Sequence, residues 1–281
     1  MIMGIRHLSL TLLALCLLLQ SANAQAVSPL LSEARQNHLL SQKLHASGDD
    51  DQALRRADKA IQLAPNEAEF HYWKAELLFE TEDDDQIALA EAMKACSIAS
   101  NACYEYLRAH LLYRLHRLPE ALSAANKSIA LGASIVNFKL KAEILMAIGH
   151  WQEAEDCLGV AIKKFGASID FAILRANVGA TLKHWSLVHE ECNQVILMRT
   201  EAARLKPKVQ VQAYLLRALA SYELGQTAQA RKEYLDVLAH WPDSREVHAA
   251  ALHFFEKTGD TKNAEKEKQS LQKFDKDVMP L

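Results

Sequence analysis

A short pattern that recurs along the chain limits what it can fold into: a glycine, four variable residues and an alanine. It stands at 48–53, 149–154, 225–230 and 259–264, and degenerate copies at 82–88, 116–121 and 183–188 fill the gaps. The last residue of each copy serves as its anchor, which gives Ala53, Ala88, Ala121, Ala154, Val188, Ala230 and Ala264. Successive anchors lie 35, 33, 33, 34, 42 and 34 residues apart. A period of this length predicts an array of structural repeats.

Each copy has the features of two helices joined by a tight turn. In the best-preserved one, residues 138–161, two apolar helices flank Gly149, which suits a helix end because glycine adopts the left-handed conformation without strain. Asp49 and Asp260 stand where the second helix needs an N-cap. Pro65 and Pro242 follow second helices and stop them. Each pair exposes an apolar face that only its neighbour can cover, so the pairs must stack.

This period and its order of large and small residues resemble the tetratricopeptide repeat (TPR) family. The first copy carries the pattern as Leu40, Ser41, Leu44, Gly48, Ala53, Ala57, Ala60 and Pro65, and the sixth as Tyr214, Ala218, Gly225, Ala230, Tyr234, Val237 and Pro242. The resemblance covers about residues 34–274 and implies an all-α, right-handed superhelical solenoid of about seven helix-turn-helix repeats. We expect a lead-in at 25–33, repeats 1–5 at 34–200, repeats 6–7 with a polar capping helix at 211–276, and a tail at 277–281.

The period breaks once, between the fifth and sixth anchors, where about eight residues are added. The junction, residues 201–210, is basic and contains Arg204, Lys206 and Lys208 around Pro207. Because proline suits the first turn of a helix, the next helix is predicted to begin at Pro207. The junction is the predicted hinge of the array.

The N-terminus has the pattern of a secretory signal peptide. Arg6 and His7 precede an apolar run at 8–19, and residues 21–24 end in a small-residue cleavage pattern. An apolar run of this length is too short to span a bilayer as a helix. Cleavage is predicted after Ala24, with Ala26 as the alternative. The mature protein is therefore expected to be exported, in the periplasm or secreted; lipid attachment at Cys16 is disfavoured because Leu15 stands where a small residue is usual.

In the family that the chain resembles, the first helix of each pair lines a concave groove that binds partners. Projecting that register gives the candidate groove residues Glu69, Tyr72, Glu76, Phe79, Tyr106, His110, Tyr113, Lys139, Glu143 and Met146. Aromatic rings on adjacent rows can hold an extended peptide or a ring-bearing ligand while charges set its orientation. The alternative is that these rings only pack between neighbouring helices.

The family's carboxylate clamp for chaperone tails is absent, since the matching positions hold His38, Gln42, Tyr72 and Glu76. An acidic chaperone tail is therefore not the expected ligand.

The cysteines that follow the signal peptide are Cys96, Cys103, Cys157 and Cys192. Cys96 and Cys103 flank one turn, so a disulfide between them is predicted, with buried free thiols as the alternative. The run 184–192 is rich in His, Glu and Cys, but its register spreads these side chains over different faces, so no metal site is predicted.

Neither a catalytic motif nor a phosphate-binding glycine loop occurs, so we expect no enzyme and no cofactor. A formal net charge of −3 gives no reason to expect nucleic acid as a partner. The leading hypothesis is a non-catalytic scaffold or adaptor of the bacterial cell envelope that binds a protein or peptide partner in its groove. The second is a periplasmic ligand-binding module for cell-wall glycan or a small aromatic ligand.

Overall fold

The computed structural model describes residues 29–81, 84–197 and 207–277, and this part of the chain is built from helices without strands. The predicted signal peptide at 1–24, residues 25–28 of the lead-in, residues 201–206 of the junction and nearly all of the predicted tail lie outside it. Within the described ranges, no helix is both long and apolar enough to cross a membrane.

The first helix covers residues 29–46. The others are α2 (Asp50–Leu63), α3 (Ala68–Thr81), α4 (Asp85–Ile98), α5 (Ala102–Arg114), α6 (Leu118–Leu131), α7 (Ile135–Ile148), α8 (Trp151–Phe165), α9 (Ile169–Leu182), α10 (Trp185–Leu197), α12 (Pro207–Glu223), α13 (Thr227–His240), α14 (Arg245–Thr258) and α15 (Thr261–Asp277). These bounds confirm the predicted series of helix pairs.

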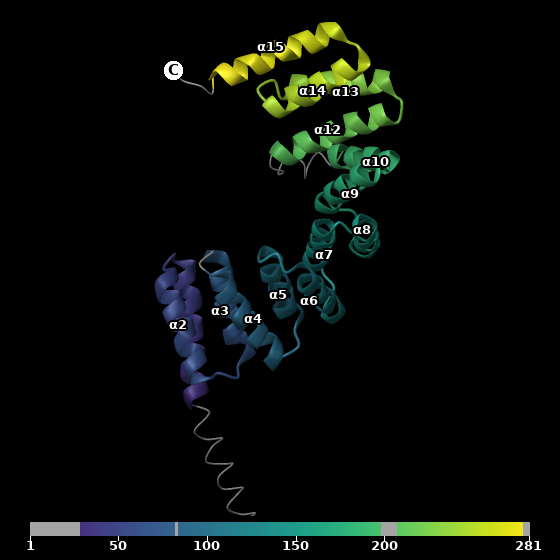
Figure 1. The fold of residues 1–281 in the computed structure, drawn as a ribbon. Coiled ribbons are helices and arrows are strands. Elements are labelled where there is room, and N and C mark those ends of the chain that lie inside the picture. The colour runs from purple at the N-terminus through teal and green to yellow at the C-terminus, as the bar shows by residue number, and fades with distance from the viewer. Residues whose placement is uncertain (1–28, 82–83, 198–206, 278–281) are drawn as a thin grey trace, which may run out of the picture. The chain divides into compact units, whose positions relative to one another are not determined.

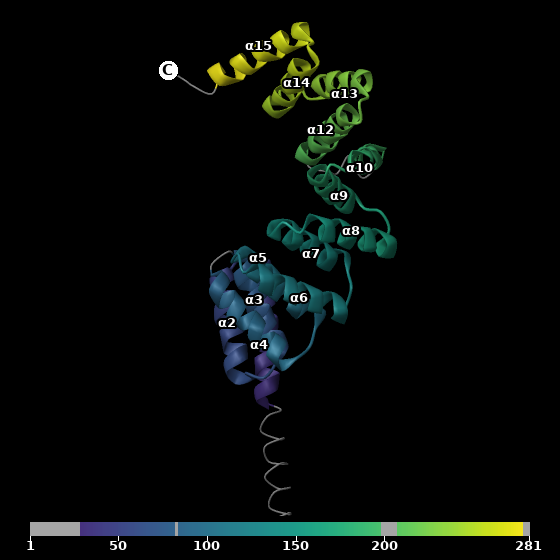
Figure 2. The same ribbon diagram turned by 45° about the vertical axis from the view of Figure 1, so that its right-hand side comes forward.

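Contacts divide the chain into two compact units, residues 1–137 and 138–281, and the division falls in the first turn of α7. In unit 1, α2, α3, α4, α5 and α6 pack in chain order, and the first helices α3 and α5 also contact each other (Figure 1). In unit 2, α12 to α15 pack in chain order (Figure 2), and α12 contacts both α9 and α14. The described part of the chain therefore has the all-α helix-pair fold that the sequence predicts.

The anchors are buried between packed helices. Six of the seven have no exposed surface, and Ala264 on the last helix is 6% exposed. In the best-preserved copy Ala142, Leu145 and Leu158 are likewise buried. Small side chains at these points allow the helix backbones to come close enough to exclude water, which explains the period of the sequence.

Outside residues 82–83, which the structure does not describe, the turns between paired helices keep a residue with positive φ even where glycine is missing. Gly48 and Gly149 have φ of 83° and 89°, as predicted for left-handed helix ends. His116 and Lys183 occupy the same place in two degenerate copies and have φ of 57° and 61°. The stacked repeats thus impose the turn on residues that adopt it at some cost.

Helix starts follow their predicted caps. The Asp49 side chain accepts a hydrogen bond from the Gln52 backbone N–H at 3.2 Å, and Asp260 accepts one from Asn263 at 3.3 Å. Pro207 begins α12, which confirms the predicted start. The rest of the junction lies outside the described residues, so its role as a hinge stays a prediction.

A polar bridge joins the two helices in four repeats, always from a glutamate three residues after the anchor, and three of the four glutamates are buried. These glutamates are Glu91, Glu191, Glu233 and Glu267. Arg175 binds Glu191 at 2.7 Å, and the corresponding arginine of the next repeat, Arg217, lies 3.2 Å from Glu233. The bridges add contacts between charged groups to the apolar contacts that hold each pair of helices together.

Histidines take the place of arginine in the other two bridges. His71 Nδ1 contacts Glu91 at 2.6 Å, and its Nε2 lies 2.9 Å from the Pro65 carbonyl oxygen. His248 repeats this arrangement between Glu267 and the Pro242 carbonyl. Each imidazole therefore ties the turn before a repeat to the second helix of that repeat.

The last helix, α15, has the character predicted for a cap. Ala264 and Glu267 are buried against α14, whereas Lys262, Lys266 and Lys268 are exposed. A charged outer face lets the final repeat end in water.

Candidate functional site

Seven of the predicted groove residues lie on α3 and α5 of unit 1. Glu69, Tyr72, Glu76 and Phe79 follow one another at helical spacing on α3, and Tyr106, His110 and Tyr113 do so on α5. Together with Tyr104 they form the surface that we call the aromatic face. Glu69 is exposed, and the rings are partly exposed.

Rings from the two helices contact each other across this face. The centroids of Tyr72 and Tyr104 are 4.9 Å apart with an interplanar angle of 32°. Phe79 and His110 are 4.7 Å apart, and His110 lies 5.9 Å from Tyr106 on its own helix. The rings therefore pack between neighbouring repeats and still present part of their surface to solvent.

The charges on the aromatic face come from glutamates of α3. The Tyr72 hydroxyl donates a hydrogen bond of 2.7 Å to Glu76, and burial raises the pKa of Tyr72, so the phenol stays a neutral donor. Glu69 lies 3.6 Å from Nε2 of His38 on the first helix. Burial lowers the pKa of His38, so this imidazole is neutral at neutral pH.

His110 is a neutral member of the face. Burial is the larger reason that its pKa is lowered, and the charge of nearby Arg114 adds to the effect. The Arg114 guanidinium lies 4.8 Å from the centre of the Phe79 ring and forms an ion pair of 3.0 Å with Asp85. One end of the aromatic face thus already holds a cation over a ring.

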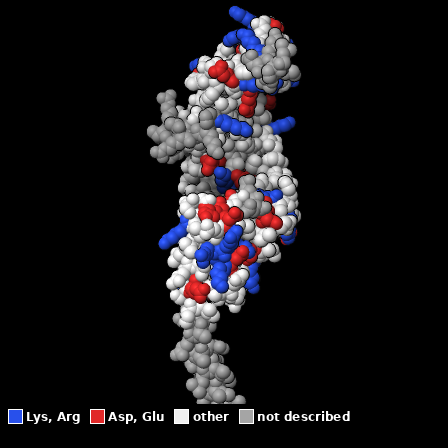
Figure 3. All heavy atoms as spheres, turned by 90° about the vertical axis from the view of Figure 1, so that its left-hand side faces the viewer, with Lys and Arg blue, Asp and Glu red and all other residues white. Residues whose placement is uncertain are grey.

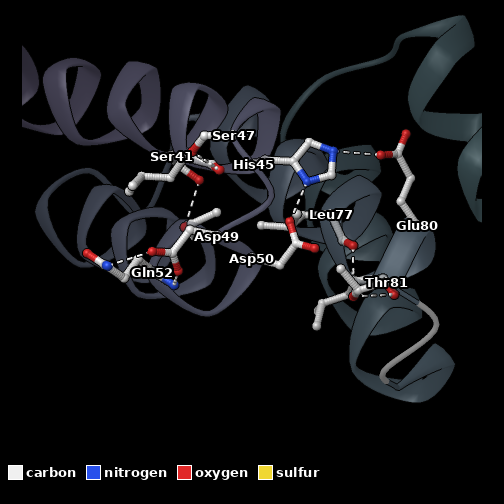
Figure 4. A network of polar contacts seen from close by, with 12 residues as sticks. Ser41, His45, Ser47, Asp49, Asp50, Gln52, Leu77, Glu80 and Thr81 are labelled. Carbon is white, nitrogen blue, oxygen red and sulfur yellow. Dashed lines mark hydrogen bonds and ion pairs between the residues drawn. The ribbon is translucent and has the colours of Figure 1, made fainter.

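A histidine clasp joins the first two repeats at the edge of this face (Figure 4). His45 Nδ1 contacts Asp50 of α2 at 2.6 Å, and its Nε2 contacts Glu80 of α3 at 2.9 Å. The Trp73 ring of α3 lies 5.8 Å from the imidazole, centre to centre. The hydrogen bond to Asp50 is the main reason that the pKa of His45 is raised, since both ring nitrogens then favour carrying a proton.

The clasp predicts a pH effect on stability. A raised folded pKa means that the contribution of His45 is fully present below its unfolded value and is lost as pH rises through the folded value. The melting temperature of His45→Gln should fall below that of the wild type by about 1–3 °C at about pH 5.5, and by less at about pH 8.5. Thermal unfolding at both pH values measures this, with His253→Gln on the exposed side of α14 as the control. An equal fall in melting temperature at both pH values would contradict this prediction.

The other predicted groove residues belong to unit 2. Lys139, Glu143 and Met146 lie on α7 and are partly exposed. Lys139 is 3.6 Å from Asp170 of α9. Burial raises the pKa of Glu143, and Lys139 opposes that effect. These three residues share a face of their own unit, and their part in a common groove stays a prediction.

Two rings of the site were not among the residues that the sequence singled out. Tyr104 packs against Tyr72 with the rings tilted, and Trp73 donates its indole N–H to the buried Ser41 hydroxyl at 2.8 Å. The Ser41 hydroxyl in turn donates to the Ala53 carbonyl at 2.7 Å. The available signal was the run of aromatics at 70–73 and 104–106, but its register favours only one ring of each run as a groove residue.

The predicted disulfide is not formed in the structure, where Cys96 and Cys103 are free thiols, as are Cys157 and Cys192. Burial raises the pKa of Cys96 to about 11, which keeps it protonated and slow to oxidise. The bridge in exported protein stays a prediction that non-reducing peptide mapping can test. Among the described residues, no group of three or more His, Cys, Asp or Glu side chains is placed to hold a metal ion.

Charges of both signs are mixed on the surface. The side of the molecule in Figure 3 shows Lys and Arg side chains next to Asp and Glu side chains. Exposed basic side chains on α2 include Arg55, Arg56 and Lys59, and Asp51 is exposed on the same helix. The aromatic face is therefore distinguished by its rings and by two glutamates without a lysine or arginine partner among the described residues, rather than by the net charge of the chain.

No protein-family model matches the chain, and no curated protein matches its sequence. Solved structures do match. The PilF protein of Pseudomonas aeruginosa has a TM-score of 0.61 at 17% identity, over 81% of this chain and 99% of its own. A tetratricopeptide repeat protein of Parabacteroides merdae has a TM-score of 0.61 at 14% identity, over 86% of this chain and 93% of its own. PilW, a type IV pilus biogenesis factor, has a TM-score of 0.61 at 16% identity, over 77% of this chain and 97% of its own. The chain thus has the tetratricopeptide repeat fold.

Proposed function

We infer that this protein is a non-catalytic scaffold that binds a protein or peptide partner on the aromatic face of unit 1. The observation that carries this is the row of ring contacts between α3 and α5. Tyr72, Phe79 and His110 are held by rings of the neighbouring helix while part of each stays exposed. Such rings offer a large contact area that is already ordered before binding, which lowers the entropy lost on association.

The face is made for recognition rather than for chemistry. Its histidine, His110, is neutral and lies between rings, and its phenol, Tyr72, is committed to Glu76. Neither has the nucleophile–base arrangement that acyl or phosphoryl transfer needs. A scaffold role uses all these features, whereas an enzyme role uses none of them.

The finer proposal is a place in the cell envelope. Its supports are the predicted signal peptide at 1–24 and the similarity of fold to PilW, a protein of pilus biogenesis. Fractionation of cells that express the full chain tests the location. Mature protein in the periplasmic or secreted fraction, beginning at Gln25 or Val27, is the expected result, and uncleaved protein in the cytoplasm would contradict it.

Recovery of partners from envelope extract tests the binding function. The wild-type chain should recover one protein in stoichiometric amount, and Tyr113→Ala on the aromatic face should recover at least about tenfold less, since a ring at the centre of an interface contributes most to binding. Met93→Ala, at an exposed position of the second helix α4, is the control and should recover as much as the wild type. Stabilisation by glycan fragments with no protein recovered would favour the ligand-binding alternative instead.

A further inference from the structure

We propose that the segment bound on the aromatic face is basic, and that a lysine or arginine of the partner lies over the Tyr72–Tyr104 ring pair beside Glu69 and Glu76. This inference rests on the proposed function and names the chemistry of its partner. Three observations carry it: the charge balance of unit 1, the neutral state of the groups beside the glutamates, and a cation already held over a ring of the same face.

Three carboxylates that pack between helices of unit 1 are compensated by the chain's own cations. Glu91 forms an ion pair with Lys74 at 3.0 Å, and Asp85 forms one with Arg114 at 3.0 Å. Glu105, which has no exposed surface, is held by Lys127 and, at 3.2 Å, by Arg108. Acidic groups between helices thus have their counter-charges built in.

The glutamates of the aromatic face lack such a counter-charge. Within the described part of the chain, no lysine or arginine lies within ion-pair distance of Glu69 or Glu76. Their neighbours are the neutral imidazole of His38 and the neutral phenol of Tyr72. Two negative charges therefore remain beside the ring pair, and they favour a cationic partner.

The imidazole beside Glu69 supplies no counter-charge. His38 is only 6% exposed, and the side-chain amide nitrogen of Gln42 lies 3.1 Å from its Nε2, closer than the Glu69 carboxylate at 3.6 Å. An amide N–H that donates to Nε2 suits a neutral ring with its proton on Nδ1. His38 therefore leaves the negative charge of Glu69 uncompensated.

The chain itself shows that this surface accepts a cation over a ring. Arg114 covers the Phe79 ring, as described above. The neighbouring Tyr72–Tyr104 pair has two rings at 4.9 Å and, among the described residues, no cation over either of them. A lysine or arginine over this pair would repeat the contact next to two free carboxylates, where a cation is favoured most.

Fluorescence anisotropy with the full chain tests the proposal. The probe is a short fluorescein-labelled peptide in which lysine alternates with leucine and alanine, and its counterpart has glutamate in place of lysine. The lysine peptide should bind and the glutamate peptide should not, and binding should weaken as sodium chloride is raised. The double variant Glu69→Gln/Glu76→Gln should bind the lysine peptide about fivefold more weakly, as expected for the loss of two exposed charge contacts.

Matched variants distinguish specific binding of the lysine peptide at the aromatic face from non-specific binding. Glu153→Gln removes an exposed carboxylate of α8 and should leave the affinity unchanged, while Tyr72→Leu keeps most of the volume, removes the ring and should weaken binding. Equal binding of both peptides, or a double variant that binds like the wild type, would overturn the basic partner. If no lysine peptide binds while a protein still cross-links to the aromatic face, the basic partner is wrong and the proposed function stands. If neither occurs, the proposed function fails as well.

Discussion

Replacing Arg175 by methionine should cost about 3 kcal/mol of the free energy of unfolding, which would make it among the most damaging single changes in unit 2. Arg175 is the partner of Glu191, whose side chain is only 6% exposed. Without the arginine, a carboxylate is left between α9 and α10 with its desolvation uncompensated. Urea unfolding followed by circular dichroism measures the loss.

The double variant Arg175→Met/Glu191→Met tests the reason for that loss. Two apolar side chains of similar volume should restore stability to within about 1 kcal/mol of the wild type. Arg117→Met removes an exposed ion pair with Glu120 and should leave the urea midpoint unchanged. A double variant as unstable as the single one would show that the bridge contributes more than the compensation of a buried charge.

The stability that Arg175→Met loses should depend on pH in a definite direction. Burial raises the pKa of Glu191 even with the arginine present, so the ionised carboxylate is disfavoured in the folded state. A raised folded pKa of a carboxyl means that stability is lost as pH rises through that value and is regained in acid. The difference in the free energy of unfolding between the wild type and Arg175→Met should therefore shrink as pH falls.

Enlarging a repeat anchor should also be strongly destabilising. Ala121→Leu places three additional carbons where α5 and α6 meet with no exposed surface, and should cost about 2–3 kcal/mol. Ala130→Leu makes the same change at an exposed position of α6 and should stay within about 0.5 kcal/mol of the wild type. Equal effects of the two changes would contradict the role given to the small residues.

Most of the fold could be read from the sequence because packing of helix pairs repeats. Ala53, Ala88 and Ala121 are predicted contact points and are buried completely. The degenerate copies are harder to read, since His116 and Lys183 take a left-handed conformation that glycine normally signals. There the neighbouring repeats, not the local residue, decide the turn.

The buried bridges were missed although they left a signal. A glutamate stands three residues after the anchor in four repeats, as at Glu91 and Glu191. Such a residue suggests a solvated helix face. Only its partner on the first helix of the repeat, His71 for Glu91 or Arg175 for Glu191, turns it into part of a polar bridge. A charge that recurs at a packing register is therefore a sign of a polar bridge.

The helix positions of the candidate residues could be predicted, but the rings that they contact could not. The sequence register places Tyr72 and Phe79 on one strip of α3, and the structure has them there. That Tyr104 rather than Tyr106 pairs with Tyr72 depends on the rotation of one repeat against the next, which no local pattern encodes. The same holds for the neutral state of His38, because burial in the assembled repeats lowers its pKa.

Site-specific photo-cross-linking in cells tests the central claim most directly. A benzophenone amino acid placed at Tyr113, on the aromatic face, should capture one defined protein partner, which mass spectrometry of the cross-linked peptide would locate. The same group at Met93, exposed on the second helix α4, should capture little or none of that partner. Capture of the partner from Met93 and not from Tyr113 would show that the chain binds through its outer helices, and would contradict the account.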